Sequence, residues 1–286
     1  MRLFIVANLD KPEVQPALRD LRAWLEKRVQ IVGMDSDSEH DLQRIQADAI
    51  LVLGGDGTLL SVARRLGGRQ IPLIGINFGR LGFLASFTPV DFQKEFEAVL
   101  AGPGLPIERR LMLEVSVLNG KSSSGPRFLA TALNDAVITA GPPFHMIELQ
   151  IATESEAGVS YYGDGVIIST PSGSTAYNVS AGGPIVNTDV HCFVVTPLCP
   201  HSLSFRPVVV SAETTITITA NRVNDGTTLF CDGQASTKLS AGDRVTIRRA
   251  KQDLLIVENP ALRGWRNLAR KLNWASRPLY NEWAEE

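Results

Sequence analysis

Ten residues decide the fold: Ala49-Ile50-Leu51-Val52-Leu53-Gly54-Gly55-Asp56-Gly57-Thr58. The first five are wholly apolar, which is typical of a strand buried on both faces of a parallel sheet. The glycines form a turn, and the apolar spacing after Thr58 predicts a helix. A strand that turns through glycines into a helix directs unpaired backbone N–H groups and the positive helix end at one point, where phosphate can bind. A tight turn in which Asp56 merely caps the helix is the alternative interpretation.

Asp56 places a carboxylate within this predicted phosphate-binding loop. A carboxylate repels a neighbouring phosphate unless it binds a divalent cation or accepts a proton from a nucleophile. Both tasks belong to phosphoryl transfer. The loop lacks the lysine of a Walker A motif, and no G-x-G-x-x-G pattern follows the first predicted strand, so these two common nucleotide folds are disfavoured.

The sequence around this loop predicts an α/β plus β fold. In the first third, strands are predicted at 3–7, 30–34, 49–53 and 71–76, and helices at 12–28, 59–66 and 89–100. This alternation indicates a parallel sheet with crossover helices, hence a Rossmann-like α/β domain over residues 1–104. The Gly- and Pro-rich run at 101–106 is the predicted linker.

The pattern of apolar and polar residues changes after the linker. Strands are predicted at 111–118, 128–139, 146–153, 208–210, 214–219, 227–231 and 244–248, and helical patterns are nearly absent. We therefore expect a β-rich, β-sandwich-like domain over residues 105–257. An amphipathic pattern at 262–274 predicts that residues 258–286 form a helical tail, and we expect this tail to pack on the first domain.

Composition narrows the class of function. The formal net charge is -2 over 286 residues, so no excess of basic residues indicates a nucleic-acid partner. The three cysteines form no CxxC pair, and no apolar run reaches the about 18 residues of a membrane span. The apolar run at the N-terminus is too short for a signal peptide. We expect a cytoplasmic enzyme that acts on small molecules and does not bind membranes.

Two motifs resemble known families. Gly54-Gly55-Asp56-Gly57-Thr58 resembles the motif shared by NAD kinases, diacylglycerol-type lipid kinases and, more distantly, phosphofructokinases. The second motif is Gly163-Asp164-Gly165-Val166-Ile167-Ile168-Ser169-Thr170-Pro171-Ser172-Gly173-Ser174-Thr175-Ala176-Tyr177-Asn178-Val179-Ser180-Ala181-Gly182-Gly183-Pro184. It resembles the diagnostic block of bacterial NAD kinases. Read physically, it predicts a buried strand at 166–168 and a short helix near 175–182 that Ser172 or Ser174 caps.

Three further stretches resemble the family: Leu133-Asn134-Asp135-Ala136-Val137, His145-Met146-Ile147 and Cys231-Asp232-Gly233-Gln234. The resemblance implies an activity and a role for each matching residue. An NAD kinase moves the terminal phosphate of ATP to the 2′-hydroxyl of the adenosine ribose of NAD, giving NADP. Asp56 is implied as the catalytic base and as a ligand of Mg²⁺. The implied phosphate-binding residues are Gly54, Gly55, Gly57 and Thr58. The implied NAD-binding residues are Asp56, Gly57, Asn134, Asp135, His145, Asp164, Thr175, Ala176, Tyr177, Asn178, Ser180 and Gln234.

Within this set, Asp164, His145 and Gln234 are expected on the nicotinamide side. The residues expected at the adenosine end are Asn134, Asp135, Thr175, Ala176, Tyr177 and Ser180. Many bacterial members of the family carry Glu where this chain has Asp135, and a basic residue where it has Tyr162. These two differences concern the affinity for NAD more than the type of reaction. The family also implies a homodimer or homotetramer with the site near the subunit boundary. The alternatives are a lipid kinase of the same superfamily and a non-catalytic NAD(P) sensor. Use of polyphosphate as donor, acceptance of NADH and feedback by NADPH stay open.

Overall fold

The first sheet contains six strands and is parallel except at one edge. The structure is a computed structural model that describes residues 1–79, 82–101, 104–120, 125–202, 204–259, 268, 271 and 272. The strand order of the first sheet is β2-β1-β3-β4-β18-β5. The strands are β1 (Arg2–Ala7), β2 (Gln30–Asp35), β3 (Ala49–Leu53), β4 (Leu73–Ile76), β5 (Ile107–Arg110) and β18 (Leu254–Val257). Only β5 runs antiparallel to its neighbour. Every residue of β3 and β4 is buried, which explains their uninterrupted apolar sequence.

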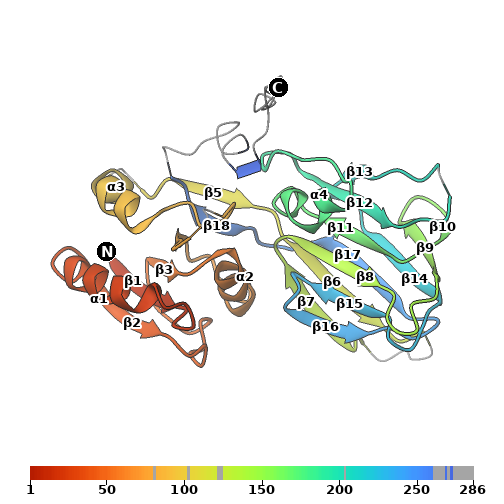
Figure 1. The fold of residues 1–286 in the computed structure, drawn as a ribbon, viewed down its shortest axis with the longest axis horizontal. Helices are drawn as coiled ribbons and strands as arrows, with labels where there is room; N and C mark the ends of the chain where they lie inside the picture. Colours follow the sequence, from red (N-terminus) through yellow and green to blue (C-terminus); the bar gives the residue numbers. More distant parts are fainter. Residues whose placement is uncertain are drawn as a thin grey trace, which may run out of the picture.

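Helices cover both faces of this sheet. Side chains of α1 (Val14–Leu25) and α3 (Pro89–Ala101) pack on one face, in a core that includes Leu18, Phe92 and Leu51. Side chains of α2 (Asp56–Arg65) pack on the other face. In Figure 1, α2 lies between the first sheet and the β-rich part of the molecule, and this placement agrees with its contacts to β7 (Phe128–Ala132). The Rossmann-like prediction is confirmed.

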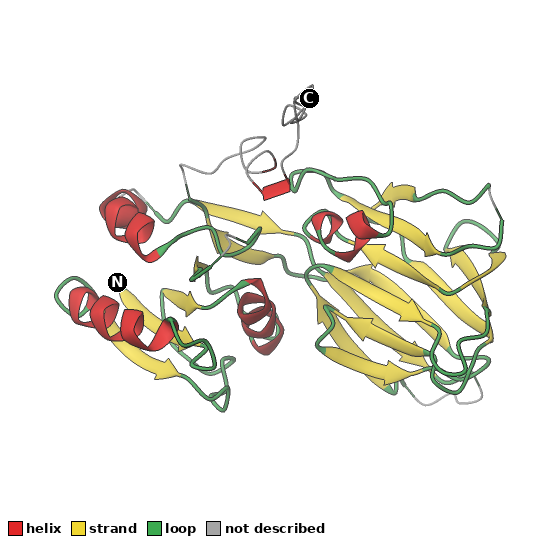
Figure 2. Ribbon diagram, in the orientation of Figure 1, coloured by secondary structure: helices red, strands yellow, loops and turns green. Residues whose placement is uncertain are grey.

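The second part is a sandwich of two antiparallel sheets around one core (Figure 2). The first has the order β10-β9-β14-β17-β6-β7, with β10 (Val159–Gly163), β9 (Ile147–Thr153), β14 (Ile216–Arg222), β17 (Arg244–Arg249), β6 (Leu113–Leu118) and β7. The second has the order β13-β12-β11-β8-β15-β16, with β13 (Val208–Ser211), β12 (Cys192–Leu198), β11 (Gly165–Ser169), β8 (Asp135–Thr139), β15 (Thr228–Cys231) and β16 (Ala235–Lys238). The β-rich, sandwich-like prediction is confirmed.

The sheets divide the chain differently from the expected boundaries at 104 and 257. Both β5 and β18 fall inside the expected second domain, yet they hydrogen-bond to each other and β18 pairs with β4. The chain therefore leaves the first sheet through β5 and returns to it through β18. Pairing between segments so far apart in sequence leaves no local pattern, so the sequence did not reveal it.

Three local expectations need correction. The strand expected at 128–139 is interrupted at Leu133 and Asn134, whose N–H groups donate to Asp232 instead of to a neighbouring strand. Neither Ser172 nor Ser174 caps the short helix, which is a 3-10 turn, η1 (Gly173–Thr175), followed by α4 (Tyr177–Ser180). Thr170 Oγ1 accepts the N–H of Gly173 at 3.1 Å instead. The expected tail helix at 262–274 lies outside the described residues except Leu268, Lys271 and Leu272.

Among the described helices, none is long and apolar enough to cross a membrane.

Candidate active site

The glycine loop opens α2 at the carboxyl end of β3. Gly55 precedes the helix in an extended conformation, and Asp56 is the first helical residue. A Cβ on Gly54 would overlap the side chain of Thr58, so only glycine fits this close turn. The first N–H groups of a helix have no partner within it, and here they belong to Asp56 and Gly57. The loop is therefore built to bind an anion.

The carboxylate of Asp56 is held by three consecutive backbone amides. Oδ2 accepts the N–H of Phe83 at 2.8 Å, and Oδ1 accepts those of Leu84 at 3.2 Å and Ala85 at 3.0 Å. A Cβ on Gly82 would overlap this carboxylate. Because each carboxylate oxygen has about two acceptor directions, one direction on Oδ2 stays open to a further donor.

Lys11 adds a positive charge beside the loop. It follows β1, which pairs with β3 in parallel, so the segments after the two strands lie side by side. A Cβ placed on Gly55 would lie 3.0 Å from Lys11 Nζ. The Lys11 ammonium forms no hydrogen bond or ion pair with any residue that the structure describes. No local pattern in the sequence marks Lys11, because its proximity to Gly55 follows from the order of the strands.

A cavity of about 330 Å³ lies along β8. It is lined by Asn134, Asp135, Val137, Thr139, Ala176, Tyr177, Phe230, Asp232 and Gly233. Alternate residues of a strand point to the same face, and Asp135, Val137 and Thr139 are spaced in this way. The cavity therefore follows β8 for roughly 13 Å, as four residues at about 3.3 Å each require. Four residues implied for NAD, Asn134, Asp135, Ala176 and Tyr177, meet here.

Asp232 is held in the same manner as Asp56. Its Oδ2 accepts the N–H of Leu133 at 2.8 Å, and its Oδ1 accepts those of Asn134 at 2.7 Å and Asp135 at 3.2 Å. Burial and then the charge of Asp232 raise the pKa of Asp135 to about 7. The carboxyl group of Asp135 can therefore be protonated or ionised near neutral pH.

One hydrogen bond joins the glycine loop to the cavity. Gln234 Nε2 donates to the carbonyl oxygen of Gly57 at 2.8 Å. Gln234 directly follows Asp232 and Gly233, which line the cavity. Asp56 itself is absent from the cavity lining. The glycine loop and the cavity are therefore separate neighbours, which the turn at residues 232–234 connects.

The structure gives Asn178 an internal role, which corrects its expected contact with NAD. Its side chain is fully buried, and Nδ2 donates to the carbonyl oxygens of Ser174 and Pro184. Its Oδ1 accepts the hydroxyl of Thr196 at 2.7 Å. Both amide protons are therefore used inside the protein. Thr175 and Ser180 flank this segment, half-buried and exposed respectively.

Asp164 and His145 lie at the opposite end of the cavity from Asp135. In the β8–β11 pairing Ser169 is opposite Asp135 and Gly165 is opposite Thr139. Asp164, one residue before Gly165, is thus about 16 Å along the strand from Asp135. The exposed His145 follows β8 in the loop at the same end. The residues implied for NAD fall into two groups at the two ends of β8. Gln234, which was expected with Asp164 and His145, lies instead at the Asp135 end.

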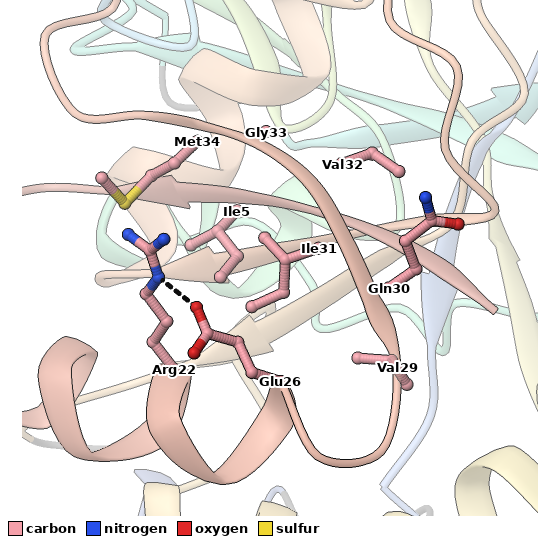
Figure 3. Close-up of a pocket in the computed structure, with 9 residues that line it drawn as sticks. All are labelled: Ile5, Arg22, Glu26, Val29, Gln30, Ile31, Val32, Gly33 and Met34. Atoms are coloured by element: carbon pink, nitrogen blue, oxygen red, sulfur yellow. Dashed lines mark hydrogen bonds and ion pairs between the residues drawn. The ribbon is translucent and has the colours of Figure 1, made fainter.

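A larger hollow, about 410 Å³, lies at the outer edge of the first sheet (Figure 3). It is formed by β2 and the end of α1, and its Arg22 and Glu26 side chains bond to each other at 2.8 Å. No residue that the sequence implied for the site lines it. We therefore place the site at the cavity along β8 and the adjoining glycine loop.

Two places in the described chain offer metal ligands. Asp56 can offer the open direction of Oδ2. Asp35, Asp37 and His40 form a second group, whose ligand atoms lie within 4.8 Å of one another. Asp35 is already neutralised by an ion pair with Arg65, which weakens the case for that group.

Comparison with known proteins agrees with both halves of the site. Residues 35–103 match the ATP-NAD kinase N-terminal domain, and residues 133–259 match the ATP-NAD kinase C-terminal domain. The chain is 36% identical to the NAD kinase of Rhodopirellula baltica over 276 residues, covering 96% of this chain and 88% of that protein. The chain belongs to the NAD kinase family. The NAD kinase of Syntrophotalea carbinolica is 39% identical over 288 residues, covering 96% of this chain and 99% of that protein.

Solved structures of the NAD kinase family share this fold. Yeast NADH kinase complexed with NADH superposes with a TM-score of 0.86 at 24% identity, over 99% of this chain and 90% of that one. An NAD kinase from Archaeoglobus fulgidus in complex with ATP gives a TM-score of 0.73 at 27% identity, over 96% of both chains. The first of these likenesses concerns the fold alone.

Proposed function

We propose that this protein is an NAD kinase that transfers the terminal phosphate of ATP to the 2′-hydroxyl of the adenosine ribose of NAD, giving NADP. The observation that carries the proposal is the Gln234–Gly57 hydrogen bond, which joins an anion-binding glycine loop to a groove lined by an amide, carboxyl groups and aromatic rings. The relatives named NAD kinase, similar over nearly the whole chain, support it.

The groove along β8 is the site for NAD in this proposal. Asn134 supplies a donor and an acceptor for an adenine edge, and an ionised Asp135 accepts from ribose hydroxyls. Tyr177 and Phe230 offer flat apolar faces to a base. The length of the groove, about 13 Å from strand geometry, suits an extended dinucleotide that points toward Asp164 and His145. The amide of Asn134 and the carboxyl groups of Asp135 and Asp232 in this lining have no use in a trough for acyl chains, which a lipid kinase needs.

The glycine loop is the site for the triphosphate. The N–H groups at Asp56 and Gly57 point from the positive end of α2, and Gly55 lets the phosphates approach the main chain. The Lys11 ammonium beside Gly55 offsets the charge of the phosphates. Phosphoryl transfer depends mainly on positioning and charge neutralisation, and these groups provide both.

Asp56 acts as the base. The open acceptor direction on Oδ2 takes the proton of the 2′-hydroxyl as its oxygen forms a bond to the terminal phosphorus of ATP. The bond between that phosphorus and the bridging oxygen breaks, and ADP leaves with the electron pair. The amides of Phe83, Leu84 and Ala85 keep the carboxylate in one orientation during the transfer.

Magnesium fits this site through a single protein oxygen. Mg²⁺ usually keeps several waters and binds through one or two carboxylates together with substrate phosphates. Asp56 Oδ2 can provide one such ligand only while its open direction does not contact the 2′-hydroxyl, because amides occupy both directions of Oδ1 and the other direction of Oδ2. When bound, the ion would neutralise charge on the terminal phosphates.

We also propose that the chain assembles as a homodimer or homotetramer. The edge strand β13 exposes Val208 and Val209, at 55% and 52% of their surface. An exposed apolar edge strand favours pairing with another chain. Light scattering coupled to gel filtration measures the assembly directly.

The test of activity uses purified protein with NAD, ATP and Mg²⁺. NADP is followed by adding an NADP-specific dehydrogenase and a dye that NADPH reduces. A parallel reaction offers diacylglycerol in place of NAD. Formation of NADP supports the proposal, whereas phosphorylation of the lipid alone, or no transfer to either acceptor, contradicts it.

A further inference from the structure

The turn between β15 and β16 carries a carboxylate to which the proposed reaction assigns no role so far. Asp232 and Gly233 both adopt left-handed conformations, with φ of 52° and 65°. Asp tolerates this region better than most residues, and glycine adopts it freely. The turn consequently brings the Asp232 carboxylate back over the start of β8.

Asp232 fixes the segment that carries Asn134 and Asp135, two of the polar residues of the groove. Its oxygens accept the N–H groups of Leu133, Asn134 and Asp135 at 2.7–3.2 Å. On the other side of the same segment, the carbonyl oxygen of Asn134 accepts the N–H of Thr170 at 2.9 Å. The main chain at Asn134 is thus held from both sides, although it belongs to no strand.

We propose that Asp232 is a positioning residue for nucleotide recognition, which holds the main chain of residues 133–135 so that the side chains of Asn134 and Asp135 face the groove. This inference rests on the proposed function, because it takes NAD as the ligand of the groove. Both side chains line the cavity together with Asp232.

The charge of Asp232 also affects Asp135. Burial, followed by the Asp232 charge, raises the pKa of Asp135 to about 7. Burial also leaves the pKa of Asp232 above its ordinary value, although its three amide donors and Arg64 of α2 offset part of the rise. The proton of the pair therefore resides on Asp135. The Cys231 thiol also faces the pair, and burial raises its pKa to about 12, so it stays neutral near pH 7.

This pairing predicts how NAD binding depends on pH. Ribose hydroxyls donate to the ionised form of Asp135, so binding favours loss of its proton. The KM for NAD should rise as the pH falls through about 7, where Asp135 becomes protonated.

The test compares Asp232→Asn with the wild-type enzyme. Asparagine keeps the shape of the side chain and tolerates the left-handed backbone, but it lacks the charge and one acceptor oxygen. We expect the KM for NAD to rise about tenfold, in the range for losing charge-assisted hydrogen bonds, while kcat changes less. Removing the like charge should also move the inflection of KM against pH below 7. Asp20→Asn, at an exposed position on α1, is the matched control.

Two results would overturn the inference. One is an Asp232→Asn enzyme with the wild-type KM for NAD and an unchanged inflection. The other is an inflection of the KM for NAD near pH 7 that persists in Asp135→Asn, although this variant lacks the titrating carboxyl group. The Asp135→Asn variant also provides the test if Asp232→Asn does not fold. Wild-type enzyme that forms no NADP would refute the proposed function itself, so the two failures are distinguishable.

Discussion

Two aspartates, one in each half of the molecule, are held by the same pattern of backbone amides. In each, Oδ2 accepts one N–H and Oδ1 accepts the next two along the chain, from residues 83–85 for Asp56 and from 133–135 for Asp232. Their surroundings differ. Asp56 opens a helix at the glycine loop, whereas Asp232 lies in a turn beside the buried carboxyl of Asp135.

The same arrangement of one carboxylate and three amides serves two purposes. At Asp56 the amides hold the carboxylate, so that its free acceptor direction has a defined position for chemistry. At Asp232 the carboxylate holds the amides, so that their neighbouring side chains have a defined position for recognition. Variants on each side should therefore affect different kinetic constants.

The largest effect is expected from Asp56→Asn. Asparagine cannot take up the proton, so kcat should fall by at least about a hundredfold, in the range for losing a general base. NAD binding, measured by calorimetry, should persist, and circular dichroism should show a folded protein. Unchanged turnover would remove Asp56 from the mechanism. Asp20→Asn again serves as the control.

Gly82→Ala tests the amide support of Asp56 without changing the carboxylate. The new Cβ would overlap the carboxylate and displace it from its three donors. We expect kcat to fall by about tenfold or more, because small misplacements of reacting groups are costly. Gly79→Ala is the matched control, since a Cβ there meets no atom within 4 Å. Equal kinetics in the two variants would show that the amides do not matter.

Lys11→Met should change the constants for ATP and spare those for NAD. The variant keeps most of the side-chain volume but removes the charge beside Gly55. We expect the KM for ATP to rise by about tenfold, as for a lost charge-assisted contact, and Lys11→Arg to recover part of the loss. The exposed Lys27→Met provides a control. A rise in the KM for NAD alone would contradict this placement.

The smallest effect concerns stability without ligand. The folded state holds the proton of Asp135 up to a pH of about 7, whereas the unfolded chain releases it near the ordinary value of 3.8. Stability should therefore decrease as the pH rises from about 4 to 7 and then level off. Asp135→Asn does not titrate, so its Tm should exceed that of the wild type by a few degrees more at pH 8 than at pH 5. A constant difference would show that Asp135 has its ordinary pKa.

Local patterns in the sequence were enough to predict most elements of the first half. The wholly apolar run 49–53 is β3 as predicted, and the helix expected at 12–28 is the shorter α1, Val14–Leu25. Burial dictates the composition of β3 and the spacing of apolar residues in α1. These signals lie within one element, so they can be read without knowledge of the fold.

The rest of the site depends on contacts between distant segments. The amides at 133–135 bind a carboxylate nearly a hundred residues later in the chain, and Lys11 reaches Gly55 only because β1 and β3 are neighbours. Asn178 is the opposite case, a residue for which the sequence predicted a contact that its burial replaces. Its position in a motif suggested a ligand contact, whereas burial commits its amide to the carbonyl oxygens of Ser174 and Pro184.

The return of the chain through β18 has a consequence for the order of events on the ribosome. β18 occupies the place beside β4, although residues 254–257 are made after nearly the whole second half. Until they emerge, the edge of β4 at Leu73 has no strand to pair with, and such open edges invite association between chains. The sandwich can close while translation continues, but the first sheet can reach its full width only after β18 has been made.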